Sequence, residues 1–463
     1  AEVNSVTVEG EGTYTINPET GEVTFQPLPT FKGTATGVDV TLTAPVGQDK
    51  DGQPVTATAT TKYTPTVTAV EPTAKPADSA GVQGETQKGT PTFTAGNAEV
   101  PIKENSVKLL NPDGTEANGP VDALDEKGNK VGEYTVNPAT GEVTFTPTDK
   151  TYTGKVVPAK VQAEDENGTK VNTTYTPTIV GVTPTASPAE TTDVQGVEQS
   201  KEVTFKPGKA TVNGVEKEVP LDPKSFTLVD ENGQPATEVP AKDPEGNVIG
   251  KYTLTTEPGK DPVAVFTPTD KTYAGPVQPV TVQAKDTNGV AVTTTYTPNI
   301  TPVKPTAKSA VSEGAQGQEQ SGTPTFTEGN TKTPIDPTVP AKLIDPETGE
   351  PTDEKSVTVP GEGTYTINPE TGEVTFKPEP NFTGKATGVE VQRVDTNGTP
   401  ATAKYTPTVK PVTPTSDDAI SEDIQGAKQT GTPVFTPGKT TINGQEVTIE
   451  IDPAVKPSLV GAD

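Results

Sequence analysis

The chain has 463 residues, more than a single soluble domain usually contains, so several domains are expected. Apolar residues make up 29% and aromatic residues 5%, so each domain can bury only a modest core. The 36 basic and 63 acidic residues give a net charge of −27, which repels nucleic acid and anionic lipid. Nucleic-acid binding is therefore excluded.

Residue types on which enzymes and metal sites commonly depend are missing. The chain has no Cys, which excludes disulfides, thiolate ligands and a thiol nucleophile. It has no His, the commonest general base and imidazole ligand, and no Met or Trp. We therefore expect no enzyme, no catalytic residues, no cofactor and no metal. Packing and backbone pairing alone must then stabilise the fold.

Two further features concern order and location. The 50 prolines and 44 glycines stay below the roughly 25–30% of aperiodic low-complexity chains, although disorder remains the alternative to packed domains. No apolar run reaches membrane length, and no signal peptide is visible at Ala1. We expect no contact with a membrane.

An internal repeat dominates the sequence. Residues 5–25 and 356–376 both read SVTVxGEGTYTINPETGEVTF and differ only where Glu9 corresponds to Pro360. More divergent copies lie at 132–145 and 250–266. Chance does not produce such identity, so we expect tandem copies of one structural unit.

Two landmarks fix the length of the unit. Tyr-Thr-Pro begins at Tyr63, Tyr175, Tyr296 and Tyr405, with spacings of 112, 121 and 109 residues. Gln-Gly begins at Gln83, Gln195, Gln316 and Gln425, with the same spacings. We predict three complete repeats flanked by a C-terminal and an N-terminal part of a repeat, with these boundaries: 1–70, 71–181, 182–302, 303–411 and 412–463. The chain thus starts and stops within a repeat, as a piece of a longer polypeptide would.

Strand patterns follow one order in each repeat. A short run around Phe93 comes first, and two alternating runs then flank residues 137–141, whose Pro and Gly favour a hairpin turn. A second pair of runs flanks residues 165–168, where Asn-Gly is the strongest short hairpin signal. The corresponding hairpin of residues 38–63 is longer, and Thr255–Gly259 replaces the Asn-Pro-x-Thr-Gly turn in the third copy.

No segment has a sustained period of 3.6 residues, and turn residues recur about every ten positions. We therefore predict an all-β fold, a tandem array of Ig-like β-sandwich repeats with about seven strands each. The proline-rich connectors at 182–185 and 412–415 favour extended backbone, so the repeats are expected to form an extended rod.

The Asp-x-Asn/Asp-Gly turns offer two interpretations. They begin at Asp49, Asp165, Asp286 and Asp395. Clustered oxygens at alternate positions can start a calcium loop, but the late bidentate Glu that such a loop needs does not recur. A plain hairpin turn is the favoured interpretation.

Other motifs also favour structural roles. The acids Glu22, Glu142 and Glu373 resemble paired glycosidase carboxylates only superficially, because the third copy has Val263 there. No Lys, Asn and acid triple recurs that would support an amide crosslink. The Tyr of Tyr-Thr-Pro is expected to lie in the core, with its hydroxyl bonded to a nearby backbone group as in a tyrosine corner.

These motifs together resemble one known family. The pattern Gly-x-Tyr-Thr-x-Asn-Pro-x-Thr-Gly-x-Val-Thr-Phe-x-Pro, the later Val-Gln-x-x-Asp-x-Asn-Gly, Tyr-Thr-Pro-Thr-Val/Ile and Val-Thr-Pro-Thr are similar to the fibril repeats of streptococcal CshA-type surface adhesins. The resemblance covers essentially the whole chain. It implies a secreted, cell-wall-anchored fibril of a Gram-positive bacterium, with a role in cell adhesion and virulence.

For such a protein the expected function is that of a structural stalk, a non-enzymatic spacer. Its partners are then the neighbouring repeats, and a tip domain absent from this sequence contacts host protein or other microbes. Two alternatives remain: the repeats themselves bind host glycoprotein, or they mediate self-association between cells through edge strands. Exposed aromatic side chains would favour binding by the repeats.

Overall fold

The computed structural model describes residues 3–461, which contain strands and turns and no helix. No helix in this part of the chain is therefore long and apolar enough to cross a membrane. The chain divides into two compact units, described here separately. The first comprises Ala1–Ala186, Phe205–Phe226 and Ala284–Val292, and the second Ser187–Thr204, Thr227–Gln283 and Thr293–Asp463.

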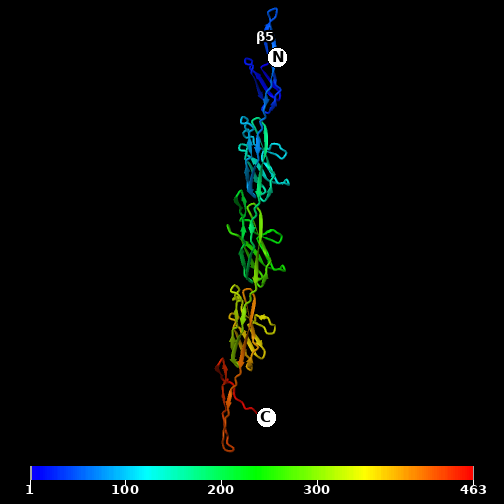
Figure 1. The fold of residues 1–463 in the computed structure, drawn as a ribbon. Helices are drawn as coiled ribbons and strands as arrows, with labels where there is room; N and C mark the ends of the chain where they lie inside the picture. Colours follow the sequence, from blue (N-terminus) through cyan, green and yellow to red (C-terminus); the bar gives the residue numbers. More distant parts are fainter. Residues whose placement is uncertain (1–2, 462–463) are drawn as a thin grey trace. The chain divides into compact units, whose positions relative to one another are not determined.

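Residues 71–181 lie within the first unit and form a two-layer sandwich (Figure 1). One sheet has the order β10-β15-β14-β13, and the other has the order β12-β17-β18-β16, with β9 parallel to β18. The strands of this repeat are β8 (Thr73–Lys75), β9 (Ala77–Val82), β10 (Gln87–Gly89), β11 (Thr92–Thr94), β12 (Lys108–Leu110), β13 (Val121–Leu124), β14 (Lys130–Val136), β15 (Val143–Pro147), β16 (Gly154–Lys155), β17 (Ala159–Glu164) and β18 (Lys170–Val180).

Residues 303–411, within the second unit, repeat this design. The sheets have the orders β35-β41-β40-β39 and β34-β44-β43-β37-β38, with β34 parallel to β44. The strands are β33 (Thr306–Lys308), β34 (Ala310–Ala315), β35 (Gln320–Gly322), β36 (Thr325–Thr327), β37 (Lys342–Ile344), β38 (Pro351–Thr352), β39 (Ser356–Val359), β40 (Gly363–Ile367), β41 (Val374–Pro378), β42 (Gly384–Lys385), β43 (Val389–Val394) and β44 (Pro400–Lys410).

Residues 182–302 contribute to both units. An additional hairpin, β23-β24, belongs to the first unit, and the sheet β21-β29-β28-β27 belongs to the second. The strands are β19 (Thr185–Ala186), β20 (Ala189–Val194), β21 (Gln199–Glu202), β22 (Phe205–Lys206), β23 (Gly208–Val212), β24 (Val215–Val219), β25 (Thr227–Val229), β26 (Pro235–Ala236), β27 (Glu238–Lys242), β28 (Val248–Thr255), β29 (Val263–Pro268), β30 (Gly275–Pro276), β31 (Val280–Lys285) and β32 (Ala291–Thr301).

The two ends of the chain hold fewer strands. The N-terminal part has β1 (Ser5–Val8), β2 (Gly12–Ile16), β3 (Val23–Pro27), β4 (Gly33–Thr34), β5 (Val38–Gln48), β6 (Pro54–Tyr63) and β7 (Thr66–Val67). The C-terminal part has β45 (Thr415–Asp417), β46 (Val434–Thr436), β47 (Gly438–Ile442) and β48 (Gln445–Ile449). The β5-β6 hairpin is long, as the sequence predicts.

The predicted hairpins are confirmed. Val136 pairs with Val143 across the Asn-Pro-Ala-Thr-Gly turn, and the left-handed φ of 75° at Gly141 favours glycine there. In the third copy Thr255 pairs with Val263, so residues 256–262 form a loop one residue longer than residues 137–142. The altered sequence therefore changes the shape of this hairpin.

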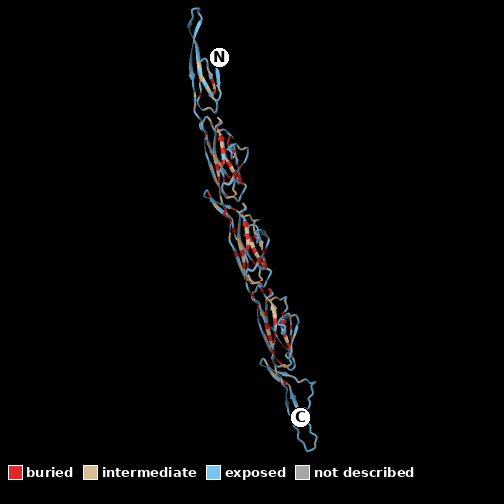
Figure 2. Ribbon diagram, turned by 90° about the vertical axis from the view of Figure 1, so that its right-hand side faces the viewer, coloured by how far each residue is buried: buried red, intermediate tan, exposed pale blue. Residues whose placement is uncertain are grey.

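The core of residues 71–181 is built on aromatic rings that pack against one another in tilted and edge-on contacts. Tyr134, Phe145 and Tyr175 are buried and come from both sheets. Tyr134 contacts Tyr175 edge-on, with ring centroids 6.1 Å apart. Buried residues line the interior of each complete repeat in Figure 2, whereas both terminal parts are mostly exposed. A few aromatic residues thus hold a thin sandwich together.

The predicted core position of the Tyr-Thr-Pro tyrosine is confirmed for Tyr175, Tyr296 and Tyr405 and is wrong for Tyr63, which is 38% exposed. The predicted backbone partner of its hydroxyl is also wrong. The Tyr175 hydroxyl lies 2.6 Å from Ser79 Oγ, a side-chain partner on the parallel strand β9. Two other tyrosines of this repeat donate to backbone carbonyls: the Tyr134 hydroxyl is 2.8 Å from Val157 O, and the Tyr152 hydroxyl is 2.8 Å from Lys155 O. Because β9 pairs in parallel with β18, the Ser79 hydroxyl lies next to the Tyr175 hydroxyl and takes the place of a backbone partner.

We expect Phe145→Ala to destabilise the chain by about 3–5 kcal/mol, because the ring is fully buried between the sheets. Thermal melting and chemical denaturation monitored by circular dichroism measure the loss. The control is Val215→Ala, a substitution at an exposed valine, which should change stability by less than about 0.5 kcal/mol. A similarly small effect of Phe145→Ala would contradict the assigned core.

Candidate functional site at the repeat junctions

The Asp-x-Asn-Gly turns place an asparagine side chain at the tip of a hairpin. In the turn between β31 and β32, Asp286 Oδ1 accepts hydrogen bonds from the backbone N–H groups of Asn288 and Val290, both at 2.9 Å. Gly289 has φ = 93°. The buried carboxylate thus closes the turn on itself. The predicted hairpin turn is confirmed, and the same pair of bonds recurs at Asp165 and Asp395.

Asn288 binds the Gln-Gly turn of the preceding repeat, within the first compact unit. Its Nδ2 donates a hydrogen bond to the Gln83 carbonyl oxygen at 2.7 Å. Gly84 follows with φ = 77°, and a Cβ added to it would lie 2.2 Å from Asn288 Oδ1. Glycine is therefore required at this position for two independent reasons, its backbone conformation and the close approach of the asparagine.

The buried Gln83 side chain ties the connector to its own repeat. Its Oε1 accepts a hydrogen bond from the Val182 N–H at 3.1 Å, and its Nε2 donates to the Thr151 carbonyl at 2.5 Å. The backbone of the same residue accepts the bond from Asn288. One glutamine therefore connects the end of a repeat, the connector and the next repeat.

The same arrangement occurs in the second compact unit. Asn397 Nδ2 donates to the Gln195 carbonyl at 2.8 Å, and Gln195 Oε1 accepts from the Val303 N–H at 3.1 Å. A Cβ added to Gly196 would lie 1.8 Å from Asn397 Oδ1. The two glutamines differ in the partner of Nε2: Gln83 donates to the Thr151 carbonyl, whereas Gln195 donates to Thr399 Oγ1 at 3.3 Å. We call this repeated arrangement of glutamine, glycine and asparagine the junction latch.

Apolar side chains and an ion pair surround the first latch. Val82, Val182, Val212 and Val219 form a small buried cluster beside it. The last two come from the β23-β24 hairpin, an insertion found in residues 182–302. Burial of these side chains adds to the hydrogen bonds of the latch.

Lys217, on the same hairpin, pairs with Glu85. Burial opposes the ionisation of Glu85, but the hydrogen bonds from Lys217 and the Val82 N–H outweigh it and lower its pKa. In the second unit, burial likewise opposes the ionisation of Asp193, but the hydrogen bonds from Lys332 and the Val194 N–H outweigh it and lower its pKa. Because the pKa values of these two carboxyls are lowered in the folded chain, their ion pairs contribute to folding stability at neutral pH. This contribution is lost as the pH falls through the lowered pKa values.

The remaining sequence candidates lie apart from the latch. Glu142 forms an exposed pair with Lys88 at 2.8 Å, and Glu373 accepts from the Ser321 hydroxyl at 2.8 Å. Both are surface charges beside a turn, as expected. Among the described residues, no group of three or more His, Cys, Asp or Glu suits a metal ion. The expectation of no catalytic, cofactor or metal site stays a prediction.

The fold and its latches define an array of tandem Ig-like repeats. A family model described as the surface adhesin CshA repetitive domain matches residues 1–67, 69–179, 181–300 and 302–409. The chain belongs to this family of surface adhesin repeats, which confirms the resemblance stated from the sequence.

More distant structural similarities were also found. The chain is similar to the I9–I11 tandem of titin (10% identity, 74% of this chain and 100% of that one, TM-score 0.26). It is also similar to mouse cadherin-23 EC22–24 (13% identity, 74% and 100%, TM-score 0.27). The protocadherin γB4 extracellular domain is matched at 11% identity over 93% of this chain and 71% of that one, with a TM-score of 0.33. A comparison with curated proteins finds no match.

Asn288→Ala should loosen the first latch, because it removes a hydrogen bond worth about 0.5–1.5 kcal/mol. We expect amide exchange around Gln83 and Gly84 to accelerate by about two- to tenfold, measured by mass spectrometry on the intact chain. Asn167→Ala, a change in the equivalent turn outside both latches, is the control. Equal effects of the two substitutions around Gln83 would contradict the latch.

Gly84→Ala tests the close approach of Asn288. Gly317 has nearly the same φ, 78° against 77°, but an added Cβ there meets nothing within 4 Å. Both substitutions carry the cost of a left-handed alanine, about 1–2 kcal/mol. Only Gly84→Ala also displaces the asparagine, so its loss of thermal stability should be the larger. Equal losses would show that backbone conformation alone selects this glycine.

Proposed function

We propose that these repeats are the stalk of a surface fibril, a non-enzymatic spacer that holds a separate adhesive tip domain away from the cell wall of a Gram-positive bacterium. The junction latch is the observation that carries this proposal. A chain of freely jointed domains needs no hydrogen bonds between repeats. This chain repeats the same bonds to a buried glutamine in both units.

The chemistry of the latch suits a spacer. The Asn amide and the Gln side chain bind backbone groups of the neighbouring repeat and of the connector, so bending at the connector breaks hydrogen bonds. At the first latch these hydrogen bonds act together with the burial of four valines, which further opposes bending there. The net charge of −27 also keeps neighbouring fibrils apart at low salt.

The alternative, in which the repeats themselves bind host glycoprotein, has less support. Its expected sign is a platform of exposed aromatic side chains. In the complete repeats the large aromatics fill cores instead: Tyr134, Tyr175, Tyr252, Tyr296, Tyr365, Tyr405, Phe145, Phe266 and Phe376 are fully buried. A tip domain is therefore the better candidate for contact with host protein or other microbes.

Small-angle scattering of the purified chain tests the stalk. Strands of roughly ten residues at about 3.3 Å each, in repeats joined end to end, predict a maximum dimension above about 120 Å. A single globule of this length would have a radius of gyration near 23 Å by the usual scaling. The double variant Asn288→Ala, Asn397→Ala should give a broader distribution of dimensions. A maximum dimension below about 90 Å would replace the stalk with a body of packed domains.

A further inference from the structure

Both latch asparagines are followed directly by glycine. Asn288 precedes Gly289, and Asn397 precedes Gly398. In an Asn-Gly pair the backbone nitrogen of the glycine can attack the Cγ atom of the asparagine side chain, because glycine has no Cβ to hinder the approach. Asparagine is a chemically labile residue, and this sequence context favours its loss. The latch therefore depends on an amide group that its own neighbour can remove.

The reaction needs no partner other than water. A bond forms between Gly289 N and Asn288 Cγ, the N–H proton passes through solvent to the side-chain amide nitrogen, and that nitrogen leaves as ammonia. Water then opens the resulting succinimide ring at either carbonyl carbon. The product is an aspartate, or an isoaspartate whose Cβ has entered the main chain. Both products carry a carboxylate in place of the amide.

The carboxylate cannot make the hydrogen bond of the latch. Asn288 Nδ2 donates to the Gln83 carbonyl oxygen at 2.7 Å, and Asn397 Nδ2 donates to the Gln195 carbonyl oxygen at 2.8 Å. A carboxylate has only acceptor oxygens, so it repels the carbonyl oxygen that the amide bound. Asn397 is only 8% exposed, so a carboxylate there would also lose most of its hydration. Deamidation therefore opens the latch, and the latch stays open because the ammonia has left.

The closed latch opposes the reaction that destroys it. The Gly289 N–H donates to the Asp286 carbonyl oxygen at 2.9 Å, and the bond to Gln83 holds the Asn288 amide on the neighbouring repeat. Attack requires the Gly289 nitrogen to leave its acceptor and the Asn288 Cγ atom to approach that nitrogen. Both hydrogen bonds must therefore break before the ring can form.

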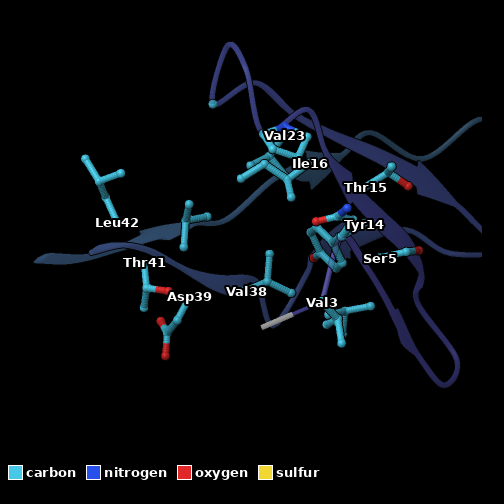
Figure 3. A pocket seen from close by; sticks show the side chains of 15 residues that line it. Val3, Ser5, Tyr14, Thr15, Ile16, Val23, Val38, Asp39, Thr41 and Leu42 are labelled. Atoms are coloured by element: carbon cyan, nitrogen blue, oxygen red, sulfur yellow. The ribbon is translucent and has the colours of Figure 1, made fainter. Parts of the chain in front are cut away.

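The turn itself tolerates the aspartate product. In the first copy, Asp51 stands at the position of Asn288, in a hairpin whose first strand, β5, borders the hollow shown in Figure 3. Asp49 Oδ1 accepts hydrogen bonds there from the N–H groups of Asp51 and Gln53, both at 2.9 Å. The hairpin keeps its turn with a carboxylate at this position, so the effect of deamidation to aspartate falls on the latch.

A matched turn in residues 182–302 lacks only the latch. Asp230 Oδ1 accepts hydrogen bonds from the N–H groups of Asn232 and Gln234 at 2.9 and 2.8 Å, the same pair of bonds as in the turn of Asn288. The Gly233 N–H donates to the Asp230 carbonyl oxygen at 3.0 Å. The Asn232 side chain is exposed and makes no hydrogen bond to another repeat within residues 3–461. Asn232 therefore reports how fast this turn reacts without a latch.

We propose that Asn288 and Asn397 are sites of spontaneous deamidation that opens the junction latches irreversibly, and that each closed latch protects its own asparagine. A junction that stays closed keeps its amide, whereas a junction that is bent or pulled open exposes the amide to attack. Each lost amide makes that junction easier to open again, so age and mechanical load soften the array at particular joints. The proposal concerns the chemistry of the latch and holds whether or not the repeats serve as a stalk.

Ageing of the intact chain at mildly alkaline pH tests the protection. Samples taken over several weeks are digested and analysed by mass spectrometry, which gives a first-order rate of deamidation for each asparagine. We expect Asn288 to react about two- to tenfold more slowly than Asn232, as the loss of one hydrogen bond implies, and Asn397 also to react more slowly than Asn232. Equal rates at Asn232 and Asn288 would contradict the proposal.

Two glycine variants show whether the latch is the cause of a slow rate. An added Cβ at Gly84 would lie 2.2 Å from Asn288 Oδ1, so Gly84→Ala displaces the amide and should raise the Asn288 rate to that of Asn232. Gly361→Ala is the control, because this glycine has a similar φ, 80° against 77°, and an added Cβ there meets nothing within 4 Å. It should leave every rate unchanged. An Asn288 that stays slow in Gly84→Ala would overturn the proposal.

The effect of the product is tested without ageing. Asn288→Asp should accelerate amide exchange around Gln83 and Gly84 by about two- to tenfold, and aged chains that have lost the Asn288 amide should show the same change. Asn232→Asp, the same substitution in the matched turn, should leave exchange around Gln83 as it is. Circular dichroism melts confirm that each variant has kept its fold. If exchange around Gln83 is unaffected by Asn288→Asp, the latch accommodates the carboxylate and the proposal fails.

Discussion

The hydrogen bond from an asparagine amide to the backbone carbonyl of a Gln-Gly turn is the interaction on which the organisation of this array depends. It requires the buried aspartate that shapes the hairpin, a glycine whose missing Cβ leaves room, and a glutamine whose side chain fixes the connector. Removing any one of them leaves buried polar groups without partners. The recurring Gln-Gly and Asp-x-Asn-Gly motifs are therefore parts of one contact.

A limited supply of apolar residues explains why the contact is polar. In each complete repeat, the largest aromatic side chains lie in the repeat's own core. In residues 71–181, for example, Tyr134, Phe145 and Tyr175 meet between the two sheets. The hydroxyls of Tyr134 and Tyr175 also bond there, to Val157 O and to Ser79 Oγ, so both buried hydroxyls have hydrogen-bond partners. At the first junction, hydrogen bonds to backbone groups act beside a small buried cluster of four valines.

Local signals in the sequence were sufficient to predict the hairpins and the buried aromatic rings of the cores. Asn-Gly and Asn-Pro-x-Thr-Gly encode their turns within a few residues, and alternation places Tyr134 and Phe145 on one face. The parallel pairing of β9 with β18 joins residues about a hundred positions apart and leaves no local pattern, because Ala77–Val82 has few apolar residues. The partner of the Tyr175 hydroxyl was missed for that reason.

The latch itself was visible in the sequence only as a spacing. Gln-Gly recurs at the intervals of Tyr-Thr-Pro, which indicated a linker of fixed length but not what fixes it. A glutamine before a glycine is consistent with any turn, and only the position of the next repeat shows that its carbonyl accepts a bond. Contacts between repeats depend on two distant segments at once, so no window of sequence encodes them.

The first copy of the turn shows how such a contact can be varied. At the position of Asn167, Asn288 and Asn397 it has Asp51, and its hairpin is extended to β5 of eleven residues and β6 of ten. Asp49 Oδ1 still accepts from the N–H groups of Asp51 and Gln53, both at 2.9 Å, so the turn is retained. A carboxylate cannot donate to a carbonyl oxygen, and two acceptors facing each other repel. An aspartate at this position therefore cannot make the bond that Asn288 and Asn397 make to a backbone carbonyl.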